Sequence, residues 1–224
     1  ELSRHHEVVV LTLWESERER QDLACLQTTY PAVGVRLRRV RGYANCLCAL
    51  PSSIPLQGSY CRVPQLTRLV RLSLGGEAEA KARLPRELQL PFDLVHVEHV
   101  RAAYLSDVIP PTMPSVLDGV DCITLLLERT RKLGYQLRYR LLAAFDLPRM
   151  KRYEGDVLAR FDQVVVCTSE NADALRALNP SLQISIVNHC VDLDYFAQSR
   201  SERSPNSIVF VGKMSYHANA SAVC

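Results

Sequence analysis

Short apolar runs alternate with longer charged segments along the chain. The apolar runs predict strands, and they lie at Glu7–Leu13, Val33–Val40, Phe92–Val97, Pro114–Asp121, Asp162–Ser169 and Ile184–Val187. Segments with apolar residues at helical spacing lie between them, at Glu15–Leu26, Leu66–Leu74, Thr124–Phe161 and Ala172–Leu178. Strands that alternate with helices at this spacing predict an α/β protein with a Rossmann-like, doubly wound parallel sheet.

Two β-branched runs near the carboxyl end, Ile184–Val187 and Ile208–Val211, predict buried strands because they are apolar on both faces. The segment between them, Ser199–Asn206, is polar and typical of a solvated linker. We therefore expect one domain over residues 1–198, a linker over 199–206, and the first strand of a second domain within 207–224.

The first residues, Glu1–His6, resemble the end of a helix that has no beginning. An open parallel sheet normally places a strand before such a helix, so we expect the first strand of the sheet to be missing from this chain. The segment Arg41–Gln65 contains three prolines, two glycines and little periodicity, which predicts loop and short helix. Such a segment is either a functional loop or a surface insertion. Thr124–Phe161 should break into two helices at Leu147–Pro148.

Composition narrows the class of protein. A net charge of +3 is too small to indicate nucleic-acid binding, and the sequence has no apolar run of about 20 residues that could span a bilayer. The stretch Glu1–Glu7 is polar and charged, so we expect no signal peptide at the start of the chain. The eight cysteines include no CxxC pair and no metal-ligand spacing, so we expect reduced thiols in a cytoplasmic protein and no bound metal.

Titratable and polar side chains lie at the carboxyl ends of three predicted strands. They are His96, Glu98 and His99 for Phe92–Val97, Asp118 and Asp121 for Pro114–Asp121, and Ser169 and Glu170 for Asp162–Ser169. Ligands of parallel α/β sheets bind beyond the carboxyl ends of the strands, so this edge is the candidate site. Plainer roles compete with this interpretation: His96 can be a core histidine, Asp121 a helix cap, and Ser or Thr at 168–169 the cap of the next helix.

Two further features suit anionic partners. Gly212 and Lys213 directly follow the run Ile208–Val211. A glycine and a cation at the end of a strand favour the close approach of an anionic ligand. The helical segment Thr124–Phe161 carries nine Lys and Arg against four acidic residues, which fits either a solvated face or contact with anionic lipid.

Several stretches together resemble the group 1 (family 4) glycosyltransferases, and most closely a bacterial subgroup linked to exosortase and exopolysaccharide loci. The stretches are PLQGSYCRVPQL, FDLVHVEHVRAA, PSVLDGVD, RYEGDVLARFDQVVVCTSENADALRAL, VNHCVDLDYF and IVFVGKMSYHANASA. The resemblance covers most of Phe92–Val223, and the last five stretches follow one another in the order of the family.

The resemblance implies a GT-B architecture, in which an amino-terminal acceptor domain and a carboxyl-terminal donor domain face each other across a cleft. This chain would be the acceptor domain with the first strand of the donor domain, and it would be inactive alone. The activity implied is retaining, metal-independent transfer from a nucleotide-diphosphate sugar to a lipid-linked or polysaccharide acceptor, in the cytoplasm or at the inner membrane face. No other cofactor is implied.

The resemblance also implies roles for single residues. His99 and Glu98 align with a catalytic position in the cleft, Gly212 and Lys213 with the donor diphosphate site, and Asp192 with a turn at the hinge between domains. Asp118, Asp121, Ser169 and Glu170 would line the acceptor side. The chain departs from the family at Ala218, where a lysine is common, and at His189–Cys190, which replace Asn–Gly.

Two other functions stay open at this point. A non-catalytic Rossmann-like domain that binds a sugar or nucleotide would need no donor domain. A sugar-nucleotide epimerase of related fold fits less well, because its histidine–glutamate pattern is not evident here.

Overall fold

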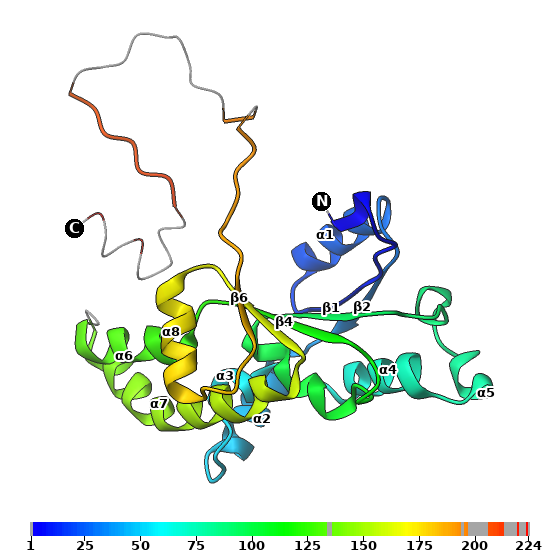
Figure 1. Cartoon of the computed structure of the whole chain (residues 1–224), viewed down its shortest axis with the longest axis horizontal. Coiled ribbons are helices and arrows are strands. Elements are labelled where there is room, and N and C mark those ends of the chain that lie inside the picture. The colour runs from blue at the N-terminus through cyan, green and yellow to red at the C-terminus, as the bar shows by residue number, and fades with distance from the viewer. Residues whose placement is uncertain are drawn as a thin grey trace.

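The computed structural model describes residues 2–133, 136–193, 195–196, 206–212, 219 and 223. It shows an α/β protein in which parallel strands alternate with helices (Figure 1). The strands are β1 (Val10–Trp14), β2 (Ala32–Arg36), β3 (Val95–Glu98), β4 (Ser115–Val120), β5 (Gln163–Val166) and β6 (Ile184–Ile186). The α-helices are α1 (Glu17–Gln27), α2 (Arg39–Ala49), α3 (Leu56–Tyr60), α4 (Pro64–Gly75), α5 (Ala78–Lys81), α6 (Ile123–Leu133), α7 (Leu137–Val157) and α8 (Ser169–Leu178). Short 3-10 helices are η1 (Leu2–Arg4), η2 (Arg86–Leu88), η3 (Val100–Val108) and η4 (Leu158–Arg160).

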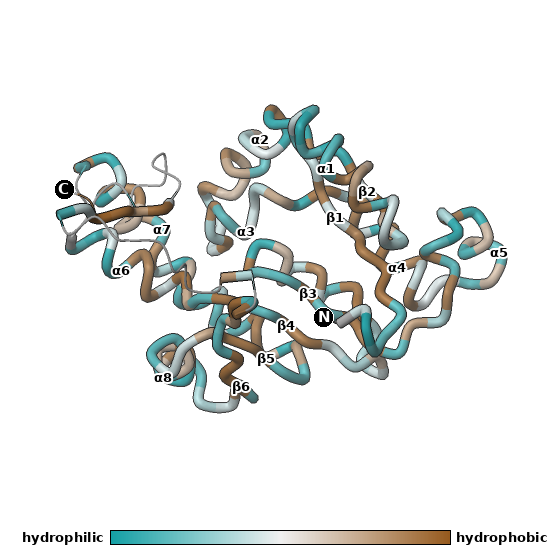
Figure 2. Tube along the Cα trace, turned by 90° about the horizontal axis from the view of Figure 1, so that it is seen from above, coloured by the Kyte–Doolittle hydropathy of each residue, from teal (hydrophilic) through white to brown (hydrophobic). Residues whose placement is uncertain are grey.

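The described strands form two parallel sheets, one of order β1-β2 and one of order β3-β4-β5-β6. Viewed from above, the strands follow one another across the molecule as β2, β1, β3, β4, β5 and β6 (Figure 2). β1 pairs only with β2, and β3 pairs only with β4, among the residues that the structure describes. The described strands therefore form two separate sheets, and the unpaired edges of β1 and β3 lie between them.

The helix η3 packs into the cores of both sheets. One core cluster joins Val35 of β2 to Leu66 of α4 and Tyr104 of η3. Val100 and Ala103 of η3 belong to the core of the four-stranded sheet, so η3 links the two sheets. Next to Val35, a Cβ on Gly34 would clash with Leu23 of α1, and successive residues of a strand point to opposite faces. Helices therefore lie on both faces of the β1–β2 sheet, with α1 opposite α4.

The main core lies on one face of the four-stranded sheet. Val97, Leu117, Val164 and Val166 pack there against α6, α7 and α8, together with Met150, Tyr153, Leu158 and Leu175. The alternate positions of the same strands are half-buried or exposed, and several are polar: His96, Glu98, Asp118, Gln163 and Ser185. The structure thus corrects the expectation that His96 is a core residue, because β3 is an edge strand whose second face is uncovered.

Two local predictions were wrong, and a third was confirmed. Pro148 lies inside α7 instead of ending a helix, and the buried neighbours Leu147 and Met150 hold the helix together across it. The segment Arg41–Gln65 contains the greater part of α2, the five-residue helix α3 and the loops around it, as its weak periodicity predicts. Val33–Val40 is shorter than predicted, because β2 ends at Arg36 and α2 begins at Arg39.

The carboxyl end also differs from its apolar pattern. β6 forms at Ile184–Ile186 as predicted, but as an edge strand its Ser185 and Ile186 are exposed. Ile208–Val211 forms no strand, and Ile208 and Val211 are 98% and 91% exposed, because no described strand lies beside them to cover these side chains. The domain and linker bounds at 198–207 stay predictions. No helix among the described residues is long and apolar enough to cross a membrane.

Candidate functional site at the carboxyl edge of the sheet

The carboxyl ends of β3, β4 and β5 bring several of the predicted residues together. His99 donates its backbone N–H to the carbonyl of Asp118 (2.7 Å), so the ends of β3 and β4 are joined at this point. The Asp121 carboxylate accepts hydrogen bonds from Asn171 Nδ2 (3.0 Å) and Cys167 Sγ (3.4 Å), which join it to α8 and β5. Asp121 is also near enough to His99 to influence its pKa.

This edge holds two unusual backbone conformations. His99 has a φ of 69° and Val120 a φ of 60°, and these are the two non-glycine residues with positive φ in the described part of the chain. Such conformations cost on the order of 1–3 kcal/mol each and cluster at active sites and ligand-binding positions. At His99 the ring Nδ1 accepts the N–H of Arg101 (3.2 Å), which fixes the ring at the start of η3.

The imidazole of His99 is held in its neutral form. Burial lowers the pKa of His99 below its usual value of 6.5, and Arg101 lowers it further, while Asp121 acts in the opposite direction. Because Nδ1 accepts a hydrogen bond, the proton of the neutral ring lies on Nε2. A neutral histidine here can donate a hydrogen bond to the hydroxyl of a ligand.

We expect an NMR titration of His99 to give a midpoint below 6.5, and Arg101→Gln to raise it. The folded state then binds this proton less readily than the unfolded state, so the His99 contribution to stability falls as the pH drops below about 6.5. A His99 midpoint above 6.5, or one that Arg101→Gln lowers, would contradict this description.

The other predicted site residues lie around His99 and Asp121 or farther from them. Glu98 is exposed at the end of β3, beside His99. Asp118 is half-buried and its carboxylate accepts the N–H of Val120 (3.0 Å). Ser169 and Glu170 begin α8 behind the cap Thr168, and Glu170 forms an ion pair with Arg129 of α6. No contact in the described part of the chain brings Ser169 or Glu170 to His99.

The residues beyond β6 can be placed only in part. The Asp192 side chain accepts the N–H of Tyr195 (3.0 Å) and its carbonyl accepts the N–H of Phe196 (2.9 Å), so Asp192 forms a turn, and its role as a hinge stays a prediction. Gly212 is exposed in the segment that leads away from the sheets (Figure 1). Lys213 lies outside the described residues.

Asp121 does not cap α6, which corrects the expected default role. The first turn of α6 is instead capped by Glu154, which comes from α7 and is 1% exposed. Its carboxylate accepts the N–H groups of Ile123 (2.7 Å) and Thr124 (2.8 Å). Asn171 Oδ1 accepts the N–H of Cys122 (3.1 Å). Asp121 is thereby left at the edge of the sheet instead of inside a helix cap.

Sequence reasoning missed a pair of interacting titratable residues, Glu15 and Tyr60, at the carboxyl end of β1. Interaction with the Glu15 carboxylate, assisted by burial, raises the pKa of Tyr60 to about 12. Arg101 influences both Cys61 and His99, which connects this group to the candidate site. The interval between Glu15 and Tyr60 is 45 residues and follows no motif, so only their proximity in the fold identifies them.

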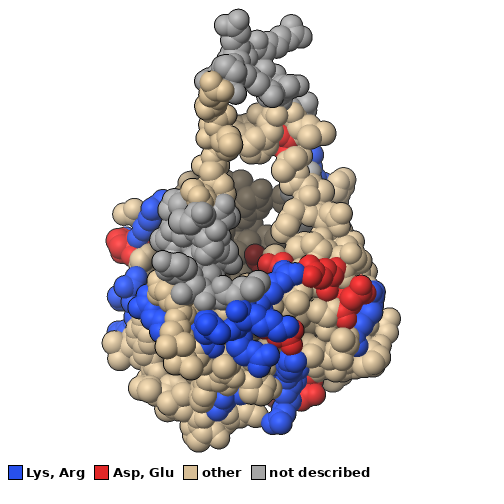
Figure 3. Space-filling view, turned by 90° about the vertical axis from the view of Figure 1, so that its left-hand side faces the viewer, with Lys and Arg blue, Asp and Glu red and all other residues tan. Residues whose placement is uncertain are grey.

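The face that carries the carboxyl ends is hollowed, and acidic side chains lie in and beside the hollow (Figure 3). Lys and Arg gather on the lower part of the same face, where α6 and α7 lie (Figure 3). No group of three or more His, Cys, Asp or Glu among the described residues is arranged to hold a metal ion.

Comparisons of the chain with known protein families, with curated proteins and with solved structures find no match. The function must therefore be argued from the fold and from the residues at this edge.

Proposed function

We propose that the chain is the acceptor-binding, amino-terminal part of a glycosyltransferase of GT-B architecture. The observation that carries the proposal is the arrangement of the strands, with His99 and Asp121 at their carboxyl edge. β1 and β3 each have an unpaired edge among the described residues, and η3 packs into the cores of both sheets.

One more parallel strand between β1 and β3 would join the two sheets. The strand order would then be that of a doubly wound fold, in which the chain runs outward in one direction through β1 and β2 and in the other through β3 to β6. The position of α1 on the face opposite α4 and α6–α8 supports this, because right-handed connections that run in opposite directions lie on opposite faces. The edges of β1 and β3 would be the switch point, where ligands of such sheets bind.

The chemistry of this edge suits a carbohydrate acceptor. Glu98 and Asp118 supply carboxylate oxygens that accept hydrogen bonds from sugar hydroxyls, and His99 supplies a neutral donor. In the reaction proposed, His99 orients the acceptor hydroxyl and Glu98 assists it. Gly212 and Lys213, as part of a donor domain, would bind the diphosphate of the nucleotide sugar, where a cation offsets the charge that grows on the leaving group.

The proposal includes contact with the inner membrane face. Leu137, Leu141 and Phe145 of α7 recur every four residues and are 67%, 62% and 41% exposed. Arg138 and Arg140 lie among them on the same helix, and an apolar stripe bordered by cations suits an anionic lipid surface. Binding to anionic vesicles tests this part of the proposal.

The experiment that tests the activity uses this chain within its full-length protein, incubated with a panel of nucleotide-diphosphate sugars and lipid-linked or polysaccharide acceptors. Transfer of sugar from one donor supports the proposal. Binding of a sugar or nucleotide without transfer or hydrolysis of any donor would favour the non-catalytic binding domain instead.

A further inference from the structure

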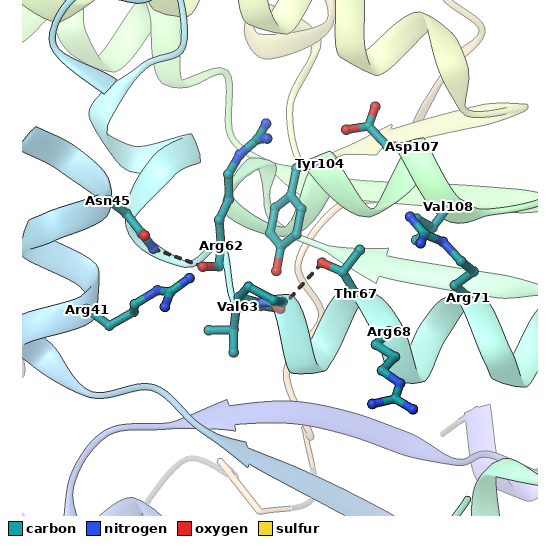
Figure 4. A pocket seen from close by; sticks show the side chains of 11 residues that line it. Arg41, Asn45, Arg62, Val63, Thr67, Arg68, Arg71, Tyr104, Asp107 and Val108 are labelled. Carbon is teal, nitrogen blue, oxygen red and sulfur yellow. Dashed lines mark hydrogen bonds between the residues drawn. The ribbon is translucent and has the colours of Figure 1, made fainter. Parts of the chain in front are cut away.

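A cavity of about 470 Å³ opens between α2, α4 and η3, away from the predicted site residues (Figure 4). Its volume lies in the range of small-molecule sites. Arg41 and Asn45 come from α2, Thr67, Arg68 and Arg71 from α4, and Tyr104 from η3. None of Glu98, His99, Asp118, Asp121, Ser169 and Glu170 lines it.

Four arginines line this cavity, and their charge is not balanced within it. They are Arg41, Arg62, Arg68 and Arg71. The single carboxylate in the lining, Asp107, already forms an ion pair with Arg160. Among the described residues, none of the four arginines forms an ion pair, and Arg41, Arg68 and Arg71 donate no side-chain hydrogen bond. Like charges that share one cavity repel one another, so a bound anion would remove an electrostatic cost.

The helices around the cavity add to its positive potential. α2 and α4 both begin without a side-chain cap and carry no acidic residue in the first turn. The amino-terminal end of a helix carries a partial positive charge, which normally favours Asp or Glu there. Arg41 lies in the first turn of α2, where the helix dipole disfavours a cation. Arg68 lies in the second turn of α4, beyond most of this effect.

The neutral polar side chains that line the cavity already form hydrogen bonds with the surrounding backbone. Asn45 Nδ2 donates to the carbonyl of Arg62 (2.9 Å), and the Tyr104 hydroxyl donates to the carbonyl of Cys61 (3.0 Å). Arg62 packs over the ring of Tyr104, 5.2 Å from its centre, and donates Nε to Gly58 (3.2 Å). These contacts fix the backbone around the cavity, whereas Arg41, Arg68 and Arg71 are left to bind a ligand.

We propose that this cavity binds a phosphate or diphosphate ester. Guanidinium groups match the geometry of phosphate oxygens, and two or more of them around one cavity favour a multivalent anion over a single carboxylate. The ester comes either from a soluble phosphorylated metabolite or from a lipid headgroup. This proposal does not depend on the glycosyltransferase proposal, because none of the candidate site residues at the carboxyl edge lines the cavity.

Calorimetric titration of the chain with inorganic pyrophosphate at about 0.1 M salt, where the screening length is about 10 Å, tests the cavity. We expect saturable binding that Arg68→Gln/Arg71→Gln weakens by roughly tenfold or more, the usual effect of losing charge-assisted hydrogen bonds. Arg18→Gln/Arg86→Gln is the matched control: it removes the same charge from exposed arginines outside the cavity and should change the affinity less than about twofold, because distant exposed charges are screened. Absence of saturable binding, or an equal loss in both double variants, would overturn the proposal.

Vesicles of phosphatidylcholine, with and without phosphatidylglycerol, identify the source of the phosphate. Binding to the anionic vesicles that pyrophosphate displaces and Arg68→Gln/Arg71→Gln weakens assigns the cavity to a lipid headgroup. Pyrophosphate binding without such vesicle binding assigns it to a soluble ester. Vesicle binding that the double substitution leaves unchanged contradicts a lipid headgroup in the cavity, and Leu141→Gln then tests whether α7 is responsible.

Discussion

Glu154→Ala is expected to lower the free energy of unfolding by about 3 kcal/mol. The substitution leaves the N–H groups of Ile123 and Thr124 buried without an acceptor, and each unsatisfied buried donor costs roughly 1–3 kcal/mol. It also removes the cap of α6, an effect of roughly 0.5–2 kcal/mol that overlaps with the first. Equilibrium urea unfolding followed by circular dichroism measures the loss.

Two variants make this measurement specific. Glu154→Gln keeps an amide oxygen that can accept one N–H, so it should cost less than Glu154→Ala. Glu128→Ala removes an ion pair with Lys151, which also joins α6 to α7 but at the surface, and should cost less than about 1 kcal/mol. If Glu154→Ala were no more destabilising than Glu128→Ala, the buried cap would not hold these helices together.

His99→Gly is expected to be more stable than His99→Ala by about 1 kcal/mol. At ordinary positions glycine is the less stable of the two, because it loses more backbone freedom on folding. At a φ of 69° and a ψ of 144° the order should reverse, since this conformation strains any residue with a Cβ. Both variants lose the ring that accepts the N–H of Arg101, so alanine is the matched control for glycine.

The same two variants, measured for both stability and activity, test whether the backbone strain at residue 99 is kept for function. Both variants should lose sugar transfer in the full-length protein, because both lack the imidazole. A His99→Gly variant that is more stable than His99→Ala but has lost activity is the result expected if the strain is retained for function. Unfolding free energies in which alanine exceeds glycine would show that the backbone at residue 99 is not strained.

The periodicity of the sequence was sufficient for the class of fold. Each of the six strands expected before residue 190 is present, because their β-branched residues have no helical spacing and Gly, Pro or Asp bounds them. The break of the sheet between β1 and β3 could not be predicted in the same way. Strand pairing depends on the whole arrangement of the chain, whereas periodicity reports only on neighbours in sequence.

The candidate site was predicted in part for the same reason. His99 and Asp121 directly follow strands and Asp118 lies near the end of β4, so their place at the carboxyl edge follows from the topology. Glu154 was missed because its partners, Ile123 and Thr124, are about thirty residues earlier in the chain. The arginine cavity was missed because α2 and α4 approach each other only through tertiary packing, while each arginine alone resembles an ordinary solvated charge.

Sugar transfer by the full-length protein, compared between His99→Ala and His96→Ala, tests the central claim most directly. The two histidines are three residues apart near the end of β3, and only His99 is held at the carboxyl edge beside Asp118 and Asp121. The account predicts that His99→Ala lowers turnover by roughly 100-fold or more, the loss expected when a reacting hydroxyl is no longer held in position. Donor affinity, and the turnover of His96→Ala, should stay close to wild type. Equal turnover of wild type and His99→Ala, or no transfer from any nucleotide-diphosphate sugar, would contradict it.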